Sequence, residues 1–134
     1  MTQKRVEAFL KLADEEFDAA ERLSGKLPRQ AYYFLQQSVE KLVRAVLEFE
    51  GLAAGTSHNL AYLAGLLPAE HGLRESLKDF EHLSSASTRY RYPSSTGAVH
   101  DVSTAVVRGT LGEVGKLRIE VKTFLRGGIQ GGSR

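Results

Sequence analysis

The residues from Pro28 to Gly51 carry the strongest structural pattern in this chain. Pro28 suits the first turn of a helix, where its missing N–H has no partner to lose, and Gly51 suits the position after the last turn. Between them, apolar side chains return every three to four residues, which is the period of one helix face. These side chains are Ala31, Leu35, Leu42, Ala45, Val46 and Phe49. We therefore predict a central helix about 30 Å long.

The same spacing on both sides of this helix predicts an all-α fold. We expect an antiparallel helical bundle of four to five helices, three long and one or two short, because no segment alternates with the period of a strand. The further helices are expected at about residues 3–24, 58–67, 69–84 and 98–125. The short turn before Pro28 makes the first two helices antiparallel neighbours, and Thr56 or Ser57 is the expected cap of the third.

One domain accounts for the 134 residues, which are enough to bury a core without disulfides. We assign residues 1–126 to the bundle and the Gly-rich residues 127–134 to a flexible tail. Cysteine is absent, which removes thiolate nucleophiles and fits a reducing compartment. The first residues lack a signal-peptide pattern, and no apolar run is long enough for a membrane span. The expected location is cytoplasmic, with no membrane contact.

Charge and histidine placement exclude several functions. Eighteen Lys and Arg against sixteen Asp and Glu give a net charge of +2, too small to indicate nucleic-acid binding by itself. The four histidines are scattered and not at metal-ligand spacing, and no Gly-rich phosphate loop occurs. We therefore expect no metal and no cofactor.

Three glycines interrupt the last predicted helix at intervals of three, at Gly109, Gly112 and Gly115. Each costs about 1 kcal/mol relative to Ala inside a helix, so their presence requires a reason. Either a neighbouring helix of the same chain approaches closely there, or the flat strip packs against a second subunit.

Three short motifs in order suggest a family. The central helix contains Gln-Gln-Ser-Val-Glu-Lys from Gln36 to Lys41, followed by Ser-His-Asn-Leu at 57–60 and Arg-Tyr-Pro at 91–93. This combination resembles the HEPN family (higher eukaryotes and prokaryotes nucleotide-binding) from the first helix to about Phe124. Ser38 departs from the family pattern, in which Ala is usual.

The resemblance implies an antiparallel bundle, often a homodimer, with a polar cleft near the second helix and the Arg-Tyr-Pro turn. Some HEPN domains are ribonucleases with Arg and His separated by four to six residues. In this chain eight residues separate Arg91 from His100 and seven separate Arg74 from His82, so that motif is absent. Others act beside a small nucleotidyltransferase, as its partner or as its counterpart in a toxin–antitoxin-like pair. The expected function is accordingly a nucleotide-binding or nucleotidyl-substrate-binding module with such a partner. We expect that the chain is not an enzyme on its own.

Two groups of side chains are candidate ligand contacts. Gln37, Lys41 and Arg44 share one face of the central helix, where cations can bind phosphate; a solvated helix face is the alternative. Arg89, Tyr90, Arg91 and Tyr92 lie together in the loop before the last helix and offer guanidinium groups and stacking rings. Packing of one Tyr beneath the loop is the alternative there, and Arg91 is the preferred functional residue.

Two histidines complete the candidates. His58, beside Thr56 and Asn59 at the start of a helix, is placed to help bind an anion, or else to brace a loop. His100 is a weak candidate for a general base, without a recognisable nucleophile. The alternative functions are a metal-independent ribonuclease using Arg91 and His100, and a helical adaptor without a ligand.

Overall fold

A computed structural model describes residues 3–130, together with the side chains of residues 3–128. Three long helices form the body of the molecule: α1 (Gln3–Leu23), α2 (Pro28–Phe49) and α5 (Thr104–Gln130). The shorter α3 (Leu60–Ala64), α4 (Arg74–Lys78) and the 3₁₀ helix η1 (Glu81–Ser87) lie between α2 and α5 in the sequence. The described residues contain no strand, so the predicted all-α bundle is confirmed.

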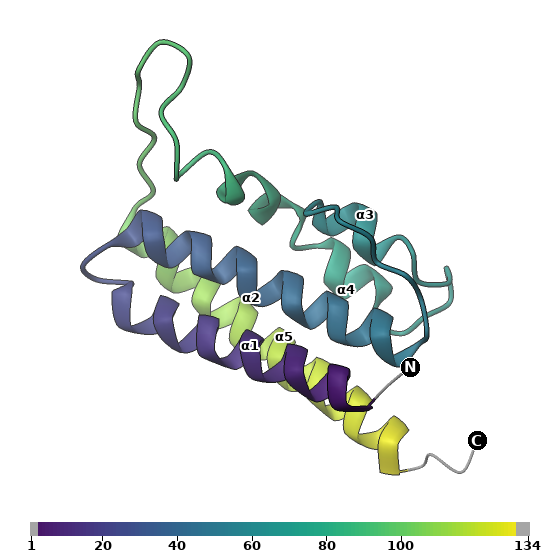
Figure 1. Ribbon diagram of the computed structural model, residues 1–134. Helices are drawn as coiled ribbons and strands as arrows, with labels where there is room; N and C mark the ends of the chain where they lie inside the picture. Colours follow the sequence, from purple (N-terminus) through teal and green to yellow (C-terminus); the bar gives the residue numbers. More distant parts are fainter. Residues whose placement is uncertain (1–2, 131–134) are drawn as a thin grey trace.

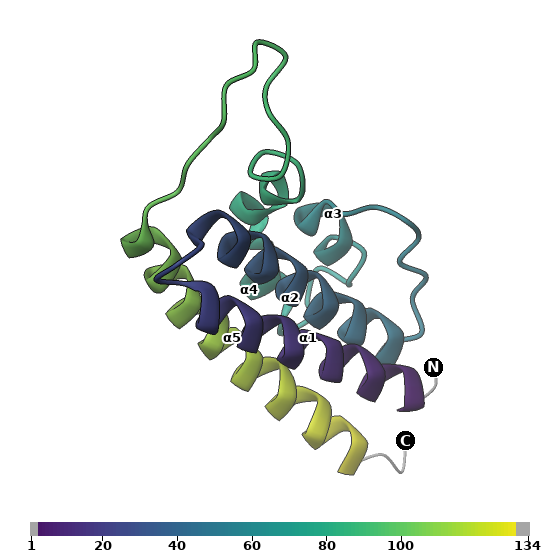
Figure 2. The ribbon, with the colours of Figure 1, turned by 60° about the vertical axis from the view of Figure 1, so that its left-hand side comes forward.

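Helix α2 lies at the centre of this bundle (Figure 1). It packs along α1 as an antiparallel neighbour and also contacts α5, while the short helices cover its opposite side (Figure 2). Gly51 ends the helix segment with a φ of 73°, a left-handed conformation that glycine adopts at little cost. Both ends predicted for this helix are therefore confirmed.

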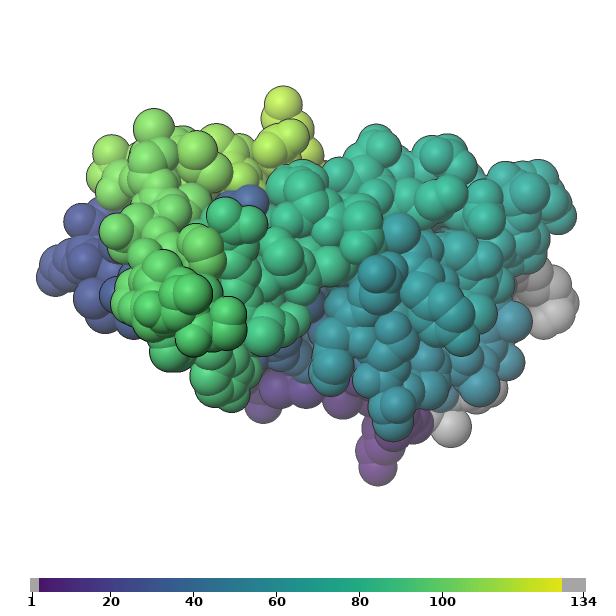
Figure 3. Space-filling model, turned by 90° about the horizontal axis from the view of Figure 1, so that it is seen from above, coloured from purple at the N-terminus to yellow at the C-terminus, as the bar shows by residue number. Residues whose placement is uncertain are grey.

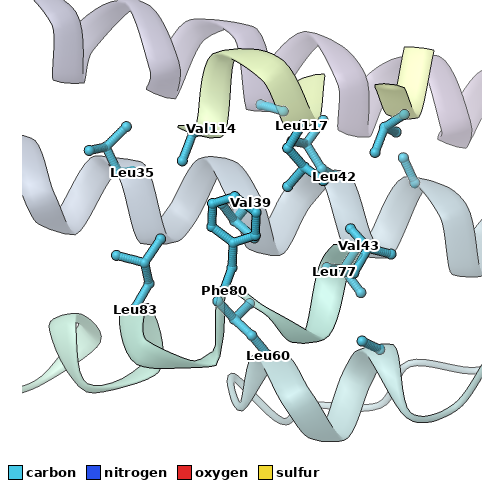
Figure 4. Close-up of a cluster of buried hydrophobic side chains, with 14 of the residues drawn as sticks. Leu35, Val39, Leu42, Val43, Leu60, Leu77, Phe80, Leu83, Val114 and Leu117 are labelled. Carbon is cyan, nitrogen blue, oxygen red and sulfur yellow. The ribbon is translucent and has the colours of Figure 1, made fainter. Parts of the chain in front are cut away.

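Buried apolar side chains reach α2 from two sides (Figure 4). Leu35 and Leu42 lie toward Val114 and Leu117 of α5. On the other side the short helices supply the partners of the central helix. These are Leu60, Leu77, Phe80 and Leu83. Because α2 has no solvated apolar face, it can keep its position only when both layers are in place.

The short helices correct the predicted boundaries. The helix expected at 69–84 is divided into α4 and η1. Its buried residues Leu77, Phe80, Leu83 and Ala86 are spaced by three, and only a 3₁₀ helix keeps such residues on one side. The helix expected at 58–67 extends only from Leu60 to Ala64.

The last helix begins later and ends later than predicted. Ser103 caps it, since its hydroxyl accepts the Val106 N–H at 3.1 Å, and α5 therefore starts at Thr104 and not at residue 98. The helix continues to Gln130, so residues 127–130, assigned from the sequence to a flexible tail, extend α5 instead. Residues 131–134 of that predicted tail lie outside the described residues.

A long segment between η1 and α5 projects from the bundle (Figures 1 and 2). Its tip is a tight turn in which the Ser94 N–H donates to the Ala98 carbonyl at 2.8 Å and Gly97 has a φ of 85°. We call residues 93–103 the arm. In the space-filling view the arm lies at one end of the molecule, and the segment of α3, α4 and η1 covers much of the rest of that face (Figure 3).

One charged cluster joins the two outer long helices. Asp14 of α1 accepts hydrogen bonds from Arg118 and Lys122 of α5, each at 2.7 Å. Arg118 also lies over the Phe17 ring, 4.2 Å from its centroid. Partial burial alone would raise the pKa of Asp14, but the hydrogen bonds and charges of Lys122 and Arg118 outweigh it and lower the pKa below 3.8.

This cluster gives a pH-dependent stability. A carboxyl group whose pKa is lower in the folded state stabilises the protein above its unfolded pKa, and this contribution is lost as the pH falls through the folded pKa. We expect Asp14→Asn to be less stable than wild type at pH 7 and the difference to shrink as the pH falls through the lowered pKa of Asp14. Urea unfolding between pH 2 and 7 measures both curves. A constant difference over that range would exclude the ionic contribution.

Candidate functional site

Arg91 lies on an aromatic surface beside the beginning of α2. Its guanidinium carbon is 4.6 Å from the ring centroid of Tyr33 and 5.3 Å from that of Tyr92. Its Nη1 is also 3.4 Å from the Tyr33 hydroxyl, to which it donates. A residue of α2 therefore meets a loop residue 58 positions later in the sequence. This contact joins the first turns of α2 to the Arg-Tyr-Pro motif at 91–93.

A hollow of about 330 Å³ adjoins this contact. It is lined by Arg29, Gln30, Tyr33, Phe34, Tyr90 and Arg91. The lining combines two guanidinium groups with aromatic rings, and its volume is at the lower end of the range for small-molecule sites. We define these six residues as the arginine–tyrosine site.

Tyr90 fixes the loop that carries Arg91. Its ring packs edge-on against buried Tyr32 of α2, with centroids 5.4 Å apart. Burial raises the pKa of the Tyr32 hydroxyl, and neighbouring Tyr90 adds to the effect. The backbone N–H groups of Arg91 and Tyr92 both donate to the Thr88 carbonyl at 3.1 Å. The site is thus held by a tyrosine pair beneath it and a turn beside it.

Two predicted residues lie at the edge of the site. Arg89 contacts the Tyr90 ring, with its guanidinium carbon 5.8 Å from the centroid. Tyr92 is largely exposed and lies against Arg91. Arg29, Gln30, Tyr33 and Phe34 are site residues that the sequence reasoning missed. The four-residue spacing of Arg29 and Tyr33, which places them on one face of the first turns of α2, was an available signal.

The polar face of α2 is occupied by contacts within the protein. Lys41 donates to both carboxylate oxygens of Glu16 in α1, at 3.0 and 3.1 Å, and to the Gln37 side chain at 3.2 Å. Burial raises the pKa of Glu16, although Lys41 opposes that shift. Gln37 in turn donates to Gln36 at 2.7 Å. The amine predicted to bind phosphate is therefore part of a link between α1 and α2.

Buried Glu40 organises the rest of this face. Gln36 donates to one of its oxygens and Arg44 to the other, each at 3.1 Å. Arg44 also donates to the carbonyls of Gly55 and Ser57, at 3.1 and 2.7 Å. These bonds hold the loop after α2 against the helix. The structure does not bring Arg44 to the arginine–tyrosine site.

His58 joins the same network from outside. Its Nδ1 is 3.0 Å from a Glu40 oxygen, while 65% of its side chain is exposed. The three N–H groups at the start of α3 are not open to an anion, because each already donates a hydrogen bond to an oxygen of the protein. The acceptors are Ser84 for Leu60, Glu81 for Ala61 and Asn59 for Tyr62. Asn59, and neither Thr56 nor Ser57, caps this helix.

None of the described histidines lines the arginine–tyrosine site. His100 is in the arm before α5 begins, and within the described residues it makes no hydrogen bond or ion pair with Arg91. His71, whose side chain is only 8% exposed, donates through Nε2 to Glu50 at 2.7 Å while its Nδ1 accepts the Leu73 N–H. In residues 3–130 no three histidines or carboxylates are grouped to hold a metal.

A larger hollow of about 600 Å³ lies between α1 and α5, but it offers a weaker case for function. Lys122 at its edge already pairs with Asp14, and none of the lining residues is aromatic. The arginine–tyrosine site has both guanidinium groups and aromatic rings, which are the features that nucleotide recognition uses. None of the helices in residues 3–130 combines the length and the apolar character of a membrane span.

Comparisons with known proteins identify the class of fold. The family model described as "HEPN domain" matches residues 6–121. The crystal structure of an archaeal HEPN homologue superimposes with a TM-score of 0.66 at 21% identity, covering 92% of this chain and 98% of that one. No curated protein matches. The chain therefore belongs to the HEPN domain family, as the sequence motifs indicated, and it shares the fold of that homologue.

The contacts of Glu40 predict a structural role for the polar face. Glu40→Ala leaves the Arg44 charge without its carboxylate in a mostly buried place, so we expect a loss of about 3 kcal/mol in the free energy of unfolding. His58→Ala is the matched control, since an exposed pair contributes at most about 1 kcal/mol. Chemical denaturation measures both variants. Equal, small losses would contradict the role assigned to buried Glu40.

Proposed function

We propose that this HEPN domain binds a nucleotide, or the nucleotidyl group of a larger substrate, at the arginine–tyrosine site. The observation that carries the proposal is the Arg91 guanidinium stacked on Tyr33 beside a hollow lined by a second guanidinium, Arg29. A guanidinium group binds phosphate through paired hydrogen bonds, and a tyrosine ring stacks on any base. The site therefore offers one group for each part of a nucleotide.

The arrangement of the other cations supports this location. Lys41 and Arg44 are engaged by Glu16, Glu40 and backbone carbonyls. A phosphate there would have to displace partly buried ion pairs, at a cost of several kcal/mol. Arg91 instead rests on aromatic rings, and a ligand can replace such a contact with a stacked base and a charged hydrogen bond.

Nucleotide titration tests the proposal. With ATP, GTP, CTP and UTP as probes, we expect at least one to raise the melting temperature of the wild-type protein, as a ligand of the native state must. Tyr33→Ala should weaken binding measured by calorimetry by about 5- to 150-fold, the range for loss of one base-stacking contact. Arg91→Ala should also weaken it, because the phosphate loses a guanidinium partner. Tyr62→Ala, which removes an exposed tyrosine of α3, is the control.

The outcomes separate this function from the adaptor alternative. If all four nucleotides leave the melting temperature unchanged, the nucleotide-binding function is wrong and an adaptor is favoured. If a nucleotide binds but Tyr33→Ala and Arg91→Ala bind it as tightly as Tyr62→Ala, the ligand uses another place on the molecule.

We further propose that the chain works as a homodimer beside a nucleotidyltransferase in the cytoplasm, as one half of a toxin–antitoxin-like pair. The partner part of this proposal is supported by the family alone. The dimer part is supported by α5, where Gly109 and Gly112 are exposed and a Cβ atom on either would meet no atom within 4 Å other than the adjacent residues and nearby backbone of α5 itself. Ile119, on the same face, is 69% exposed.

The space around the three glycines argues against the explanation that a neighbouring helix of the same chain approaches closely there. At Gly115 a Cβ atom would meet Phe17 at 3.6 Å, an ordinary contact distance, so close approach within the chain does not require glycine at any of the three positions. A flat strip on an exposed helix favours close packing of a second subunit, since small residues allow two backbones to approach.

Purification of the tagged chain tests the assembly. We expect the wild-type protein to have the mass of a dimer by light scattering, and Gly112→Leu to have the mass of a monomer because the added side chain separates the surfaces. Mass spectrometry of proteins recovered from the native cell should identify a nucleotidyltransferase. An unchanged mass for Gly112→Leu counts against this dimer surface, and recovery of the chain alone counts against the partner.

A further inference from the structure

An acidic residue of the arm lies beside the site. Asp101 is in the segment that returns from the tip of the arm to α5, and its Oδ1 is 3.5 Å from Nε of Arg29. Arg29 belongs to the first turn of α2 and lines the hollow. Among the described residues, this is the one ion pair formed by a cation of the arginine–tyrosine site. Arg91 contacts rings and a hydroxyl instead.

A carboxylate and a phosphate present the same chemistry to a guanidinium group, since both are oxyanions that accept its hydrogen bonds. We propose that Asp101 is an internal competitor, which occupies Arg29 in the free protein and is displaced by the phosphate of the ligand. This inference rests on the proposed function and adds a regulatory element to it. It also defines the ligand class more narrowly, as a phosphorylated nucleotide and not a nucleoside.

The Asp101–Arg29 ion pair is exposed on both sides, which makes it easy for a ligand to displace. The side chain of Asp101 is 87% exposed and that of Arg29 is 37% exposed. An exposed ion pair contributes at most about 1 kcal/mol, whereas the pairs of Lys41 and Arg44 are mostly buried. A phosphate with more charge and more acceptor oxygens than a carboxylate therefore displaces Asp101 without disturbing the fold.

Displacement also changes how the arm is held. Asp101 joins the returning part of the arm to α2, three residues before α5 begins at Thr104. The tip of the arm is closed by its own hydrogen bonds between Ser94 and Ala98. When phosphate takes Arg29, the arm keeps its turn but loses this ionic contact with the bundle. Occupancy of the site is thereby coupled to the position of a segment that projects from the molecule (Figure 2).

The full-length Asp101→Asn variant tests the competitor, because Asn keeps the shape of Asp and removes its charge. We expect it to bind ATP, GTP, CTP or UTP, whichever the wild type binds, about two- to five-fold more tightly, the equivalent of one exposed ion pair. The gain should shrink as salt is added. The matched control is Glu75→Gln, which neutralises an exposed carboxylate 3.7 Å from Arg74 on α4. Its affinity should equal that of the wild type.

The corresponding nucleosides complete the test, since they lack the group that competes with Asp101. Calorimetry should give the same nucleoside affinity for all three proteins. Unchanged or weaker nucleotide binding by Asp101→Asn overturns the competitor while wild-type binding still supports the proposed function. An equal gain for nucleosides overturns the phosphate assignment. Absence of nucleotide binding in every protein overturns both the competitor and the function on which it rests.

Discussion

Burial of α2 on two sides is the constraint on which the rest of the molecule depends. Helix α1 and helix α5 take one side, and the short helices take the other. The residues on the enclosed faces of this helix are buried from water, so each polar group among them must find a partner in the protein. The fold therefore determines not only where the apolar residues lie but also which polar residues remain available to a ligand.

The polar groups in the middle of α2 show this consequence. Glu40 and Gln36 are buried, and they are satisfied by one another, by Arg44 and by His58. Lys41 neutralises Glu16 across the interface with α1. These charges hold helices and a loop together, and any that was freed for a ligand would leave its partner buried without compensation. The ligand that we propose would bind at the end of the helix, where Arg29 and Tyr33 border a hollow.

At that end, the loop after η1 supplies what the helix lacks. Tyr90 packs on Tyr32 and fixes the loop, Arg91 lies on Tyr33, and Asp101 returns to Arg29. The contacts differ in strength in a way that suits their roles. The tyrosine pair is partly buried, whereas the ion pair is exposed and weak. In the function that we propose, a ligand would displace the ion pair and leave the tyrosine pair and the bundle unchanged.

Periodicity in the sequence was sufficient for the long helices, because an amphipathic stripe is a local property of the chain. Periodicity predicted the bounds of α1 and α2 to within a few residues and identified the all-α class. It failed to predict the bounds of the later helices, where helix spacing and capping residues compete with the apolar pattern. Three-residue spacing turned the end of the fourth helix into η1, and Ser103 capped α5 after an extended segment that the apolar pattern included in the helix.

The sequence by itself also determined the family and one half of the candidate site, since Tyr90 and Arg91 stand together in a single loop. Only the tertiary structure decided the other half. Tyr33 and Arg91 are 58 residues apart in the sequence. Lys41 and its carboxylate partner Glu16 are 25 residues apart. Helical spacing shows which residues share a face, but it cannot show which face meets which partner. Whether a cation is engaged or available is therefore a property of packing between elements that are distant in the chain.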